Sequence, residues 1–582
     1  QSVIAGKEYD VTAKVLACND NGTTVVTSYT GTPTVAHTLN QPTSGVDGVL
    51  GYSPVFSSDD KGITQDTFSI SESGLFTIKL TDSSFDCTGI SGCPTDGNGQ
   101  LTGSFDVESR PWKLAICDVE NIDGTIVNPA ETDDINGGFI SAGSSFKASF
   151  KPIVHPDFYT TLPVDECNYQ TTYNYFTETG HITPLKLTFE LAYPNTGILS
   201  NLDPSNFPGD YSFISGDKVG NVRQKTVNLS WQEAGALNLK SDAAYYGENL
   251  QQDTQVIGRF YPKYFIQDIN EWIVADQNNV AYLSQPYDSA IHKVYPMASG
   301  QSDTTKALNN YRFFSSTLQA EFGVLDDSNV DNDFLLDTTS GTWDPSRVNW
   351  LLDDDNAMLK RHTTGNVSRK DRPFNTSDGS STVTNFGLTV TGTDPVSFTD
   401  SDPVTNSAAF PVQPPARYGR MALDDIGGNS GATLIIPLRA EFWNGSDFVV
   451  NTDDDKSTFN GANYCKQVIW HSESKTTTNA LFNGSGTVSD GEDDINASQN
   501  TPSGADSPRE QARLWLRMED DNPSKKTGEN DISCLGSNEG QSWLRYNWQQ
   551  LGDEDPSTVV TFGIYRGNDR VIYRGESGLT GQ

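Results

Sequence analysis

Short apolar runs separated by polar turn residues cover most of this chain. Between 434 and 443, Leu434, Ile436 and Leu438 occupy every second position, which is the period of a β-strand with one buried face. Other runs are rich in Val, Ile, Thr, Phe and Tyr and are bounded by Gly, Asn, Asp, Ser and Pro. This pattern favours antiparallel sandwiches over βαβ units. We therefore expect an all-β protein in which helices are scarce.

Two turn signals near the C-terminus agree with this fold class. The pair Asn444-Gly445 tolerates positive φ and predicts a tight hairpin after the strand at 434–443. The triplet 567–569 (Gly-Asn-Asp) predicts a second turn, between strands at 562–564 and 571–573.

The chain also repeats itself at the size of a domain. An upstream segment that opens a strand after a small-residue turn occurs three times: Ile4–Val11, Ser141–Ala148 and, more loosely, Leu283–Ala290. Two downstream segments occur twice each: Glu72–Ile78 with Glu233–Leu239, and Gly103–Phe105 with Gly258–Phe260. Recurrence of these segments in one order indicates a duplicated domain.

The repeats divide the 582 residues into four expected domains, since a single core does not keep growing to this length. The pattern around Glu72 and Glu233 is typical of tandem immunoglobulin-like surface domains just before their final strands. We predict immunoglobulin-like β-sandwiches at 1–109 and 110–260, a divergent third sandwich at 261–410, and a distinct C-terminal β-sandwich at 411–582. The proline-rich stretch 394–415 is predicted to be a stiff connector.

Charge and hydropathy restrict the partners. Lys and Arg number 39 against 76 Asp and Glu, and the net charge of −37 repels a phosphate backbone, so we expect no nucleic-acid partner. No stretch approaches the ~20 apolar residues that a membrane helix needs, so we expect no membrane span. The start at Gln1 without a signal sequence indicates a mature end or, preferably, a fragment of a longer precursor.

The seven cysteines are sparse and lack the paired spacing of a zinc site. In an exported protein this favours disulfides. Cys465 and Cys534 are alone in the last domain and are predicted to pair, and Cys117 is predicted to pair with Cys167 by the same reasoning. The preferred pairing among the other three is Cys87 with Cys93, which leaves Cys18 as a buried thiol.

An acidic run is the best metal candidate in the sequence. Asp327, Asn329, Asp331 and Asp333 have the alternate spacing of a calcium loop, although the glycine at the sixth position and the final glutamate are missing. The acidic runs 453–455 and 492–494 are further candidates. Each run can equally be a solvated acidic turn, so a calcium site and a solvent-exposed turn both stay open.

The patterns that would indicate an enzyme are weak. The loop Gly428-Asn429-Ser430-Gly431 is similar to the nucleophile loop of chymotrypsin-like proteases, but the candidate base His37 lies in another predicted domain. We therefore interpret this segment as a glycine-rich hairpin loop between strands at 417–424 and 433–443. The six histidines are scattered, and no acidic pair is singled out for glycoside hydrolysis.

Five tryptophans in the last domain could stack on sugar rings, although such residues are more often part of a core. They are Trp443, Trp470, Trp515, Trp543 and Trp548. Trp443 and Trp515 fall out of phase with their apolar neighbours, so each is expected either to be exposed or to cover the second sheet.

Four segments in the last third carry a family resemblance: ARYGRMALDDIGG (416–428), LIIPLRAEFWNGSDFVVNTDDD (434–455), SWLRYNW (542–548) and DPSTVVTFGIYRGNDRVIYR (555–574). Together they resemble the MSHA pilus biogenesis protein MshQ family, which are large secreted proteins encoded with type IV pili of Gram-negative, mostly marine bacteria. Family members usually carry a lectin-like domain upstream. The resemblance implies export through the periplasm to the cell surface or the medium, and pilus or pilus-assembly proteins as partners. It implies no catalytic residues.

Three functional classes follow from these observations. We expect a non-enzymatic extracellular component of a type IV, MSHA-like pilus system, acting as a surface stalk, an adhesin or an assembly protein. The alternatives are a carbohydrate-binding module with surface glycans as ligands, and an extracellular glycoside hydrolase. Calcium is the one cofactor that the sequence suggests.

Overall fold

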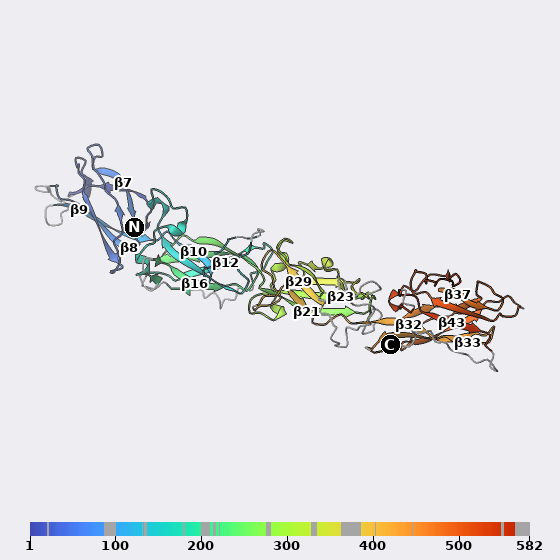
Figure 1. The fold of residues 1–582 in the computed structure, drawn as a ribbon. Coiled ribbons are helices and arrows are strands. Elements are labelled where there is room, and N and C mark those ends of the chain that lie inside the picture. Colours follow the sequence, from blue (N-terminus) through green and yellow to red (C-terminus); the bar gives the residue numbers. More distant parts are fainter. Residues whose placement is uncertain are drawn as a thin grey trace. The chain divides into compact units, whose positions relative to one another are not determined.

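The computed structural model describes most of the chain, and its fold is nearly all β (Figure 1). The described residues are 1–19, 22–85, 100–130, 132, 137–177, 181–199, 210–212, 217–219, 222–274, 281–326, 334–361, 386–401, 403–444, 446–503, 505–548 and 552–564. Within these ranges the helical elements are short 3-10 turns: η1 (Pro156–Phe158), η2 (Glu166–Asn168), η3 (Asn174–Phe176), η6 (Thr304–Lys306), η7 (Tyr311–Phe313), η8 (Thr338–Ser340) and η9 (Ser542–Leu544).

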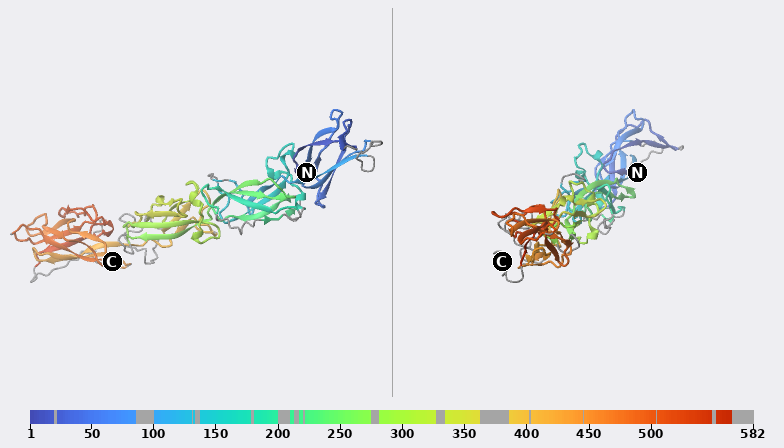
Figure 2. Two further views of the ribbon diagram at one scale, coloured as in Figure 1. Left: turned by 180° about the vertical axis from the view of Figure 1, so that it is seen from behind. Right: turned by 90° about the vertical axis from the view of Figure 1, so that its right-hand side faces the viewer.

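The chain forms two compact units. The first consists of Gln1–Tyr264, Pro296–Gln319 and Gly392–Pro395, and the second of Phe265–Tyr295, Ala320–Thr391 and Val396–Gln582. The strands group into four successive β-sandwiches, each with two sheets (Figures 1 and 2). The predicted fold class, tandem immunoglobulin-like sandwiches followed by a distinct C-terminal β-sandwich, is confirmed.

The first sandwich packs a four-stranded sheet on a three-stranded sheet. The larger sheet has the order β1 (Ser2–Ile4), β9 (Leu101–Arg110), β8 (Gly74–Asp82), β5 (Thr34–Gln41), and the smaller has the order β2 (Tyr9–Lys14), β7 (Ile63–Ile70), β6 (Leu50–Gly51). A hairpin of β3 (Leu16–Asn19) and β4 (Gly22–Val25) follows β2. Phe68, Phe76 and Ile78 are at most 2% exposed and join the two sheets in one core.

The second sandwich has a larger core, centred on Trp231 and Phe260. One sheet has the order β10 (Lys113–Asn121), β11 (Ser145–Ile153), β16 (Lys225–Ser230), and the other has the order β13 (Asp210–Tyr211), β12 (Leu185–Tyr193), β17 (Gly235–Asp242), β20 (Asp253–Phe260). Two short ladders accompany them: β14 (Lys218–Val219) with β15 (Val222–Arg223), and β18 (Ala244–Tyr245) with β19 (Glu248–Asn249).

The third sandwich has an aromatic core. The ring centroid of Phe322 lies 4.8 Å from that of Trp350 and 5.5 Å from that of Phe265. Its sheets have the orders β21 (Tyr264–Ile273), β23 (Ser289–Met297), β27 (Trp350–Asp354), β26 (Thr342–Trp343), and β24 (Glu321–Asp326), β29 (Phe386–Thr391), β30 (Ser407–Ala409). The short ladders are β22 (Ala281–Tyr282) with β31 (Ala416–Arg417), and β25 (Phe334–Leu335) with β28 (Met358–Leu359).

The predicted connector at 394–415 is wrong, because this stretch is built into the fold. Asp394 accepts a hydrogen bond from the Nη2 of Arg259 at 2.6 Å, and the Arg259 side chain is fully buried. Ser407–Ala409 form the edge strand β30, and Phe410 is 3% exposed. Prolines are compatible with edge strands and turns, so their number alone did not distinguish a connector from an edge.

The fourth sandwich contains the strand that the alternation at 434–443 predicts. One sheet has the order β32 (Gly419–Leu423), β34 (Leu434–Trp443), β40 (Glu492–Gln499), β38 (Ala480–Asn483), with β35 (Phe448–Val450) also on β34. The other has the order β33 (Ile426–Gly428), β43 (Ser557–Phe562), β41 (Glu510–Leu516), β37 (Tyr464–His471), β42 (Ser533–Leu535), and a ladder joins β36 (Thr458–Asn460) to β39 (Ser485–Thr487). Leu434, Ile436 and Leu438 are buried while Ile435 is 60% exposed, which confirms the alternation.

Turn predictions in this sandwich have different outcomes. Trp443 pairs with Phe448 in the β34–β35 hairpin, as the Asn-Gly signal predicts. The strands predicted on either side of 428–431 pair antiparallel as β32 and β34, as a hairpin requires. Their connection is more than a loop, because it includes β33, which pairs in parallel with β43 in the opposite sheet. The turn predicted at 567–569 lies outside the described residues.

A buried histidine in the second unit is expected to make that unit sensitive to acid. His292 on β23 is 1% exposed, and its ring stacks on Phe410 at 4.6 Å and packs on Trp272 at 4.9 Å. Both of its ring nitrogens lack a hydrogen-bond partner among the described residues. Burial lowers the pKa of His292 from its usual 6.5 to about 4, because the charged ring would lose its hydration.

Replacement of this histidine by phenylalanine is expected to reduce the fall in the free energy of unfolding as pH decreases. The unfolded chain binds a proton that the folded chain does not between pH 6.5 and 4, so wild type loses about 3 kcal/mol as pH falls through this range. The variant His292→Phe lacks this loss, and urea unfolding of both proteins between pH 4 and 7 measures the difference. Equal slopes in the two proteins would show that His292 is not buried in its neutral form.

Candidate functional site

A buried glutamate holds together two segments of the first unit that are distant in sequence. Glu72 follows β7 and is 3% exposed. Its carboxylate accepts hydrogen bonds from the backbone N–H groups of Ser73 at 2.9 Å, Tyr173 at 2.9 Å and Asn174 at 3.0 Å. Burial raises the pKa of Glu72, and these three N–H donors oppose the shift.

Asn174 completes this arrangement from the other side. Its fully buried side-chain amide donates to the backbone carbonyls of Val46 and Ser73, both at 2.8 Å, and its Oδ1 accepts from the N–H of Val46 at 2.7 Å. Every polar atom of the amide therefore has a partner in the first sandwich, while Asn174 itself follows β11 of the second. We call the contacts of Glu72 and Asn174 the first clasp.

The same set of contacts occurs a second time within the first unit. Glu233 is fully buried and accepts from the N–H groups of Ala234 at 2.9 Å and of Asn309 and Asn310 at 3.0 Å. The amide of Asn310 donates to the carbonyls of Ile198 and Ala234, and its Oδ1 accepts from the N–H of Ile198 at 2.7 Å. Glu233 and Asn310 therefore form a second clasp with the same donors and acceptors.

Glycines give both asparagines room. A Cβ added at Gly45 or at Gly197 would overlap the Oδ1 of Asn174 or of Asn310. Each glycine precedes the residue that exchanges two hydrogen bonds with the asparagine, Val46 or Ile198. Only a residue without a side chain allows this close approach.

The upstream repeat supplies backbone contacts near each clasp. Gly6 and Gly143 have φ of 80° and 81°, and their N–H groups donate to the carbonyls two residues before Glu72 and Glu233. The carbonyls of Ala5 and Ala142 accept from His155 and Ser299. The matched segments therefore have equivalent structural roles.

Two of the sequence matches are out of register. The third upstream copy is shifted by one residue. Ser284 has φ of 69°, and its N–H donates to the carbonyl of Leu359. Ser284 is therefore the counterpart of Gly6 and Gly143, which also have positive φ and also donate an N–H to a carbonyl. The match of Gly103–Phe105 with Gly258–Phe260 is also wrong. Ser109, not Phe105, is the counterpart of Phe260, since Ser109 and Phe260 lie opposite the equivalent Gly74 and Gly235.

An arginine takes the place of the glutamate in the third repeat. Arg361 lies two residues after Leu359, just as Glu72 lies two residues after Ile70, and it is 7% exposed. Its Nη1 donates to the carbonyls of Gly419 at 3.1 Å, Trp543 at 3.2 Å and Arg545 at 2.6 Å. The hydrogen-bond polarity is thus reversed: a cation donates to carbonyls where the carboxylates accept from N–H groups.

The clasp contacts are not predicted by the sequence analysis. The pattern around Glu72 and Glu233 predicts only a following strand, and it does not point to either asparagine. The sequence does carry a signal, because a Pro-x-x-Gly turn precedes Val46 and Ile198, and an Asn-Tyr pair occurs at 174–175 and 310–311. Comparison of these two pairs of segments would have indicated the contact.

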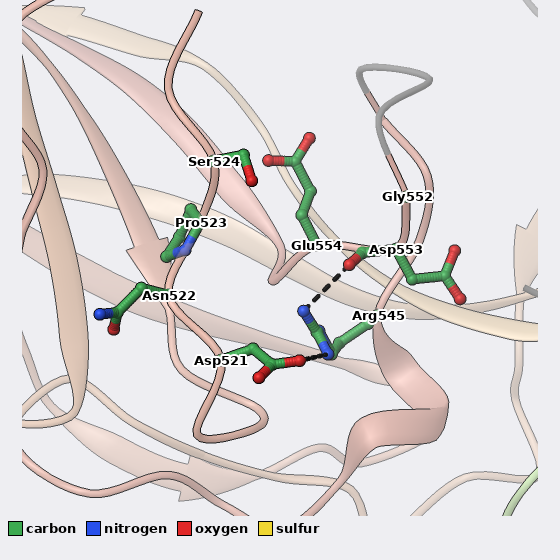
Figure 3. A pocket seen from close by; sticks show the side chains of 8 residues that line it. All are labelled: Asp521, Asn522, Pro523, Ser524, Arg545, Gly552, Asp553 and Glu554. Carbon is green, nitrogen blue, oxygen red and sulfur yellow. Dashed lines mark hydrogen bonds and ion pairs between the residues drawn. The ribbon is translucent and has the colours of Figure 1, made fainter. Parts of the chain in front are cut away.

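A polar pocket of about 290 Å³ in the fourth sandwich is the other candidate site (Figure 3). Asp521, Ser524, Asp553 and Glu554 surround it together with Arg545. The Arg545 guanidinium donates to Glu519 at 2.7 Å and to the carbonyl of Asp553 at 2.9 Å, which neutralises part of the acidic charge. The lining includes neither histidine nor cysteine, and its charged groups are three carboxylates and Arg545.

The two disulfides that are predicted between cysteines far apart in sequence are confirmed. Cys117 on β10 is bonded to Cys167, 50 residues later. Cys465 on β37 is bonded to Cys534 on the neighbouring strand β42, 69 residues later. Cys87 and Cys93 lie outside the described residues, and the structure gives only the backbone of Cys18, in β3.

The calcium candidates Asp327, Asn329, Asp331 and Asp333 also lie outside the described residues. Elsewhere in the described part of the chain, no three His, Cys, Asp or Glu side chains gather as a metal-binding group. The acidic residues at 453 and 454 have other partners: Asp453 pairs with Arg417 at 2.7 Å, and Asp454 accepts from the Tyr282 hydroxyl at 2.6 Å.

The protease-like loop has no catalytic partners among its described contacts. The Ser430 Oγ is buried without a hydrogen-bond partner in the described part of the structure, and Gly431 donates to Gln499. His37 lies in the first sandwich, where its Nε2 is 3.0 Å from the carbonyl of Asp47.

Most tryptophans of the last sandwich are not free for stacking. Trp515 is 1% exposed and donates to Glu554, so it covers the sheet rather than facing solvent. Trp543 packs against the core, and Trp548 packs on Tyr546 and on the guanidinium of Arg420. Trp470, at 52% exposed, is the most accessible of the five.

The sheets, cores and clasps define a tandem immunoglobulin-like β-sandwich protein. Three family models match the sequence: the second domain of DUF6701 at 110–223, the third domain at 233–414 and the fourth domain at 417–577. The chain therefore belongs to the DUF6701 family. No curated protein matches the sequence.

Several solved structures are similar at low identity. The ICAM-5 D1–D4 ectodomain fragment has 7% identity and a TM-score of 0.24, with 92% of this chain and 97% of that one covered. Sidekick-1 immunoglobulin domains 1–5 have 8% identity and a TM-score of 0.22, with 97% and 78% covered. Domains 1–6 of the surface layer protein SbsC have 10% identity and a TM-score of 0.16, with 98% and 54% covered.

Proposed function

We propose that the chain is a non-enzymatic extracellular component of a type IV, MSHA-like pilus system, where it acts as a surface stalk, an adhesin or an assembly protein. The likeness of the segments at 416–428, 434–455, 542–548 and 555–574 to the MshQ family supports this proposal. Its partners would be pilus or pilus-assembly proteins.

The duplicated clasp is the observation that carries the proposal. Glu72 fixes Asn174, 102 residues later, and Glu233 fixes Asn310, 77 residues later, in each case through buried hydrogen bonds. Contacts of this kind at successive junctions are what a spacer built from tandem domains needs. Two disulfides and, in the described ranges, no helix long and apolar enough to cross a bilayer are compatible with an exported protein.

Labelled antibodies test where the protein acts, and X-ray scattering tests the spacer role. Labelling along pili or at their bases supports the proposal, and label confined to the cytoplasm contradicts it.

Scattering should give an elongated particle, with a broader range of sizes for the double variant Glu72→Ala/Glu233→Ala. A compact particle of unchanged size in both proteins would contradict a spacer.

Calcium is part of this proposal through Asp327, Asn329, Asp331 and Asp333. A bound ion stabilises the folded state by mass action, so 1 mM calcium should raise the melting midpoint by a few degrees, roughly the effect of 1–2 kcal/mol. The change should be absent with chelator and in the variant Asp331→Ala/Asp333→Ala. Equal midpoints with calcium and with chelator would remove calcium from the proposal.

Carbohydrate binding is the second candidate, and the exposed Trp470 is the observation that favours it. A glycan array with wild type and Trp470→Ala tests it, because this substitution removes an accessible ring without opening the core. Saturable binding that is lost in the variant supports a lectin role.

A further inference from the structure

A lysine at the start of the second sandwich is buried against two carboxylates. Lys113 begins β10, and its side chain is 8% exposed. Its Nζ lies 2.8 Å from the Oδ1 of Asp253 and also forms an ion pair with Glu166. Lys147, which pairs with Glu120 in the same sandwich, has a side chain that is 27% exposed. Lys113 is therefore more buried than the lysine of this neighbouring ion pair.

Three elements of the fold bring these groups together. Lys113 forms a parallel bridge with Gln251, so Asp253, two residues further along, lies on the same face as Gln251. Glu166 begins η2, and the disulfide between Cys167 and β10 ties this turn to the same strand. The contact between the lysine and the two carboxylates is thus fixed by the backbone and by a covalent bond.

Aromatic rings cover the lysine. Its Nζ lies 4.7 Å from the ring centroid of Trp112, which stacks on Tyr169 at 6.5 Å, and Tyr169 is 6% exposed. Burial alone would lower the pKa of Lys113, but its hydrogen bonds to Asp253 and Glu166 outweigh burial and raise the pKa. The amine becomes nucleophilic once a proton has moved to a carboxylate, and Glu166 touches the Nζ directly.

Asp253 is oriented so that its two oxygens have different surroundings. Its Oδ2 accepts a hydrogen bond from the backbone N–H of Ile116 at 2.8 Å, whereas its Oδ1 faces the Nζ of Lys113. The N–H donor can stabilise negative charge that develops on Oδ2 when the carboxyl carbon is attacked. Oδ1 is then the oxygen that can leave.

We propose that Lys113 and Asp253 condense to an intramolecular amide bond, with Glu166 as the catalytic residue that carries the proton. The Lys113 ammonium gives one proton to the Glu166 carboxylate, and the neutral Nζ attacks the Cγ of Asp253. The new C–N bond forms as the bond from Cγ to Oδ1 breaks. Oδ1 takes the proton held by Glu166 and one more from Nζ, and it leaves as water. Glu166 returns to its carboxylate form, and no oxidant or reductant is needed.

The bond would join the two strands that begin and end the second sandwich. A pull on the chain would pass from β10 to β20 through the amide, so that the residues between 113 and 253 would carry no load. This modification goes beyond the proposed pilus function and does not depend on it.

Mass spectrometry of the full chain with its disulfides reduced tests the proposal. Wild type should be lighter than its sequence requires by the mass of one water molecule. The variants Lys113→Met and Glu166→Gln should have the masses of their sequences. The matched control Lys147→Met removes the lysine of the neighbouring ion pair and should retain the loss of water.

Tryptic digestion of denatured, reduced wild type makes the test independent of variant folding. Trypsin cuts after free lysine, so the peptide bond between Lys113 and Leu114 should stay intact, and the fragment with Lys113 should be joined to the fragment with Asp253. A wild-type mass equal to that of the sequence, or complete cleavage after Lys113, overturns the proposal. A loss of water that persists in Lys113→Met overturns it as well.

Discussion

Replacement of Glu233 by alanine is expected to lower the free energy of unfolding of the first unit by about 3–5 kcal/mol. The substitution leaves the buried N–H groups of Ala234, Asn309 and Asn310 without an acceptor, and each unsatisfied group costs about 1–3 kcal/mol. Calorimetry and urea unfolding of the full chain measure the effect. Glu233→Gln should cost less, because its one oxygen can still accept from Ala234 and Asn310.

The first clasp supplies a matched control. Glu72→Ala should cost a similar amount, since Glu72 accepts from three equivalent N–H groups at equal distances within 0.1 Å. Glu190→Ala, which removes an exposed carboxylate that pairs with Lys240, should cost less than about 1 kcal/mol. A loss of that small size in Glu233→Ala as well would contradict the clasp.

Removal of the Cys465–Cys534 disulfide is expected to destabilise the second unit by about 4 kcal/mol. The bond closes a loop of 69 residues, and opening it restores that much entropy to the unfolded chain. The double variant Cys465→Ser/Cys534→Ser should melt earlier in the second unit only. A melting profile equal to that of wild type would show that the bond does not form in solution.

The Cys117–Cys167 disulfide serves as the control for location. Its loop spans 50 residues in the first unit, so Cys117→Ser/Cys167→Ser should have an effect of similar size on the other transition. If loss of Cys117–Cys167 lowered the transition of the second unit, or loss of Cys465–Cys534 that of the first, the division into units would be contradicted.

Local patterns were enough to predict the fold class. The alternation from Leu434 to Ala440 needs only one buried face, and the turn after Trp443 needs only two residues that tolerate its backbone geometry. The disulfides followed from counting, because Cys465 and Cys534 had no other local partner. Such signals are contained within one strand or one domain.

The clasps could not be predicted in the same way. The Glu72 carboxylate is bonded to N–H groups about 100 residues away, and nothing in the sequence around Glu72 specifies that distance. Ser284 obscured the third repeat because it adopts the positive φ that glycine has in the other two.

Hydrogen exchange with mass spectrometry at the two asparagines tests the central claim, that equivalent buried clasps hold the first unit together. Peptides that contain Tyr173 and Asn174, or Asn309 and Asn310, should exchange slowly in wild type. Glu72→Ala should release only the first peptide, and Glu233→Ala only the second. Exchange of both peptides at the rate of open loops in wild type would contradict the account.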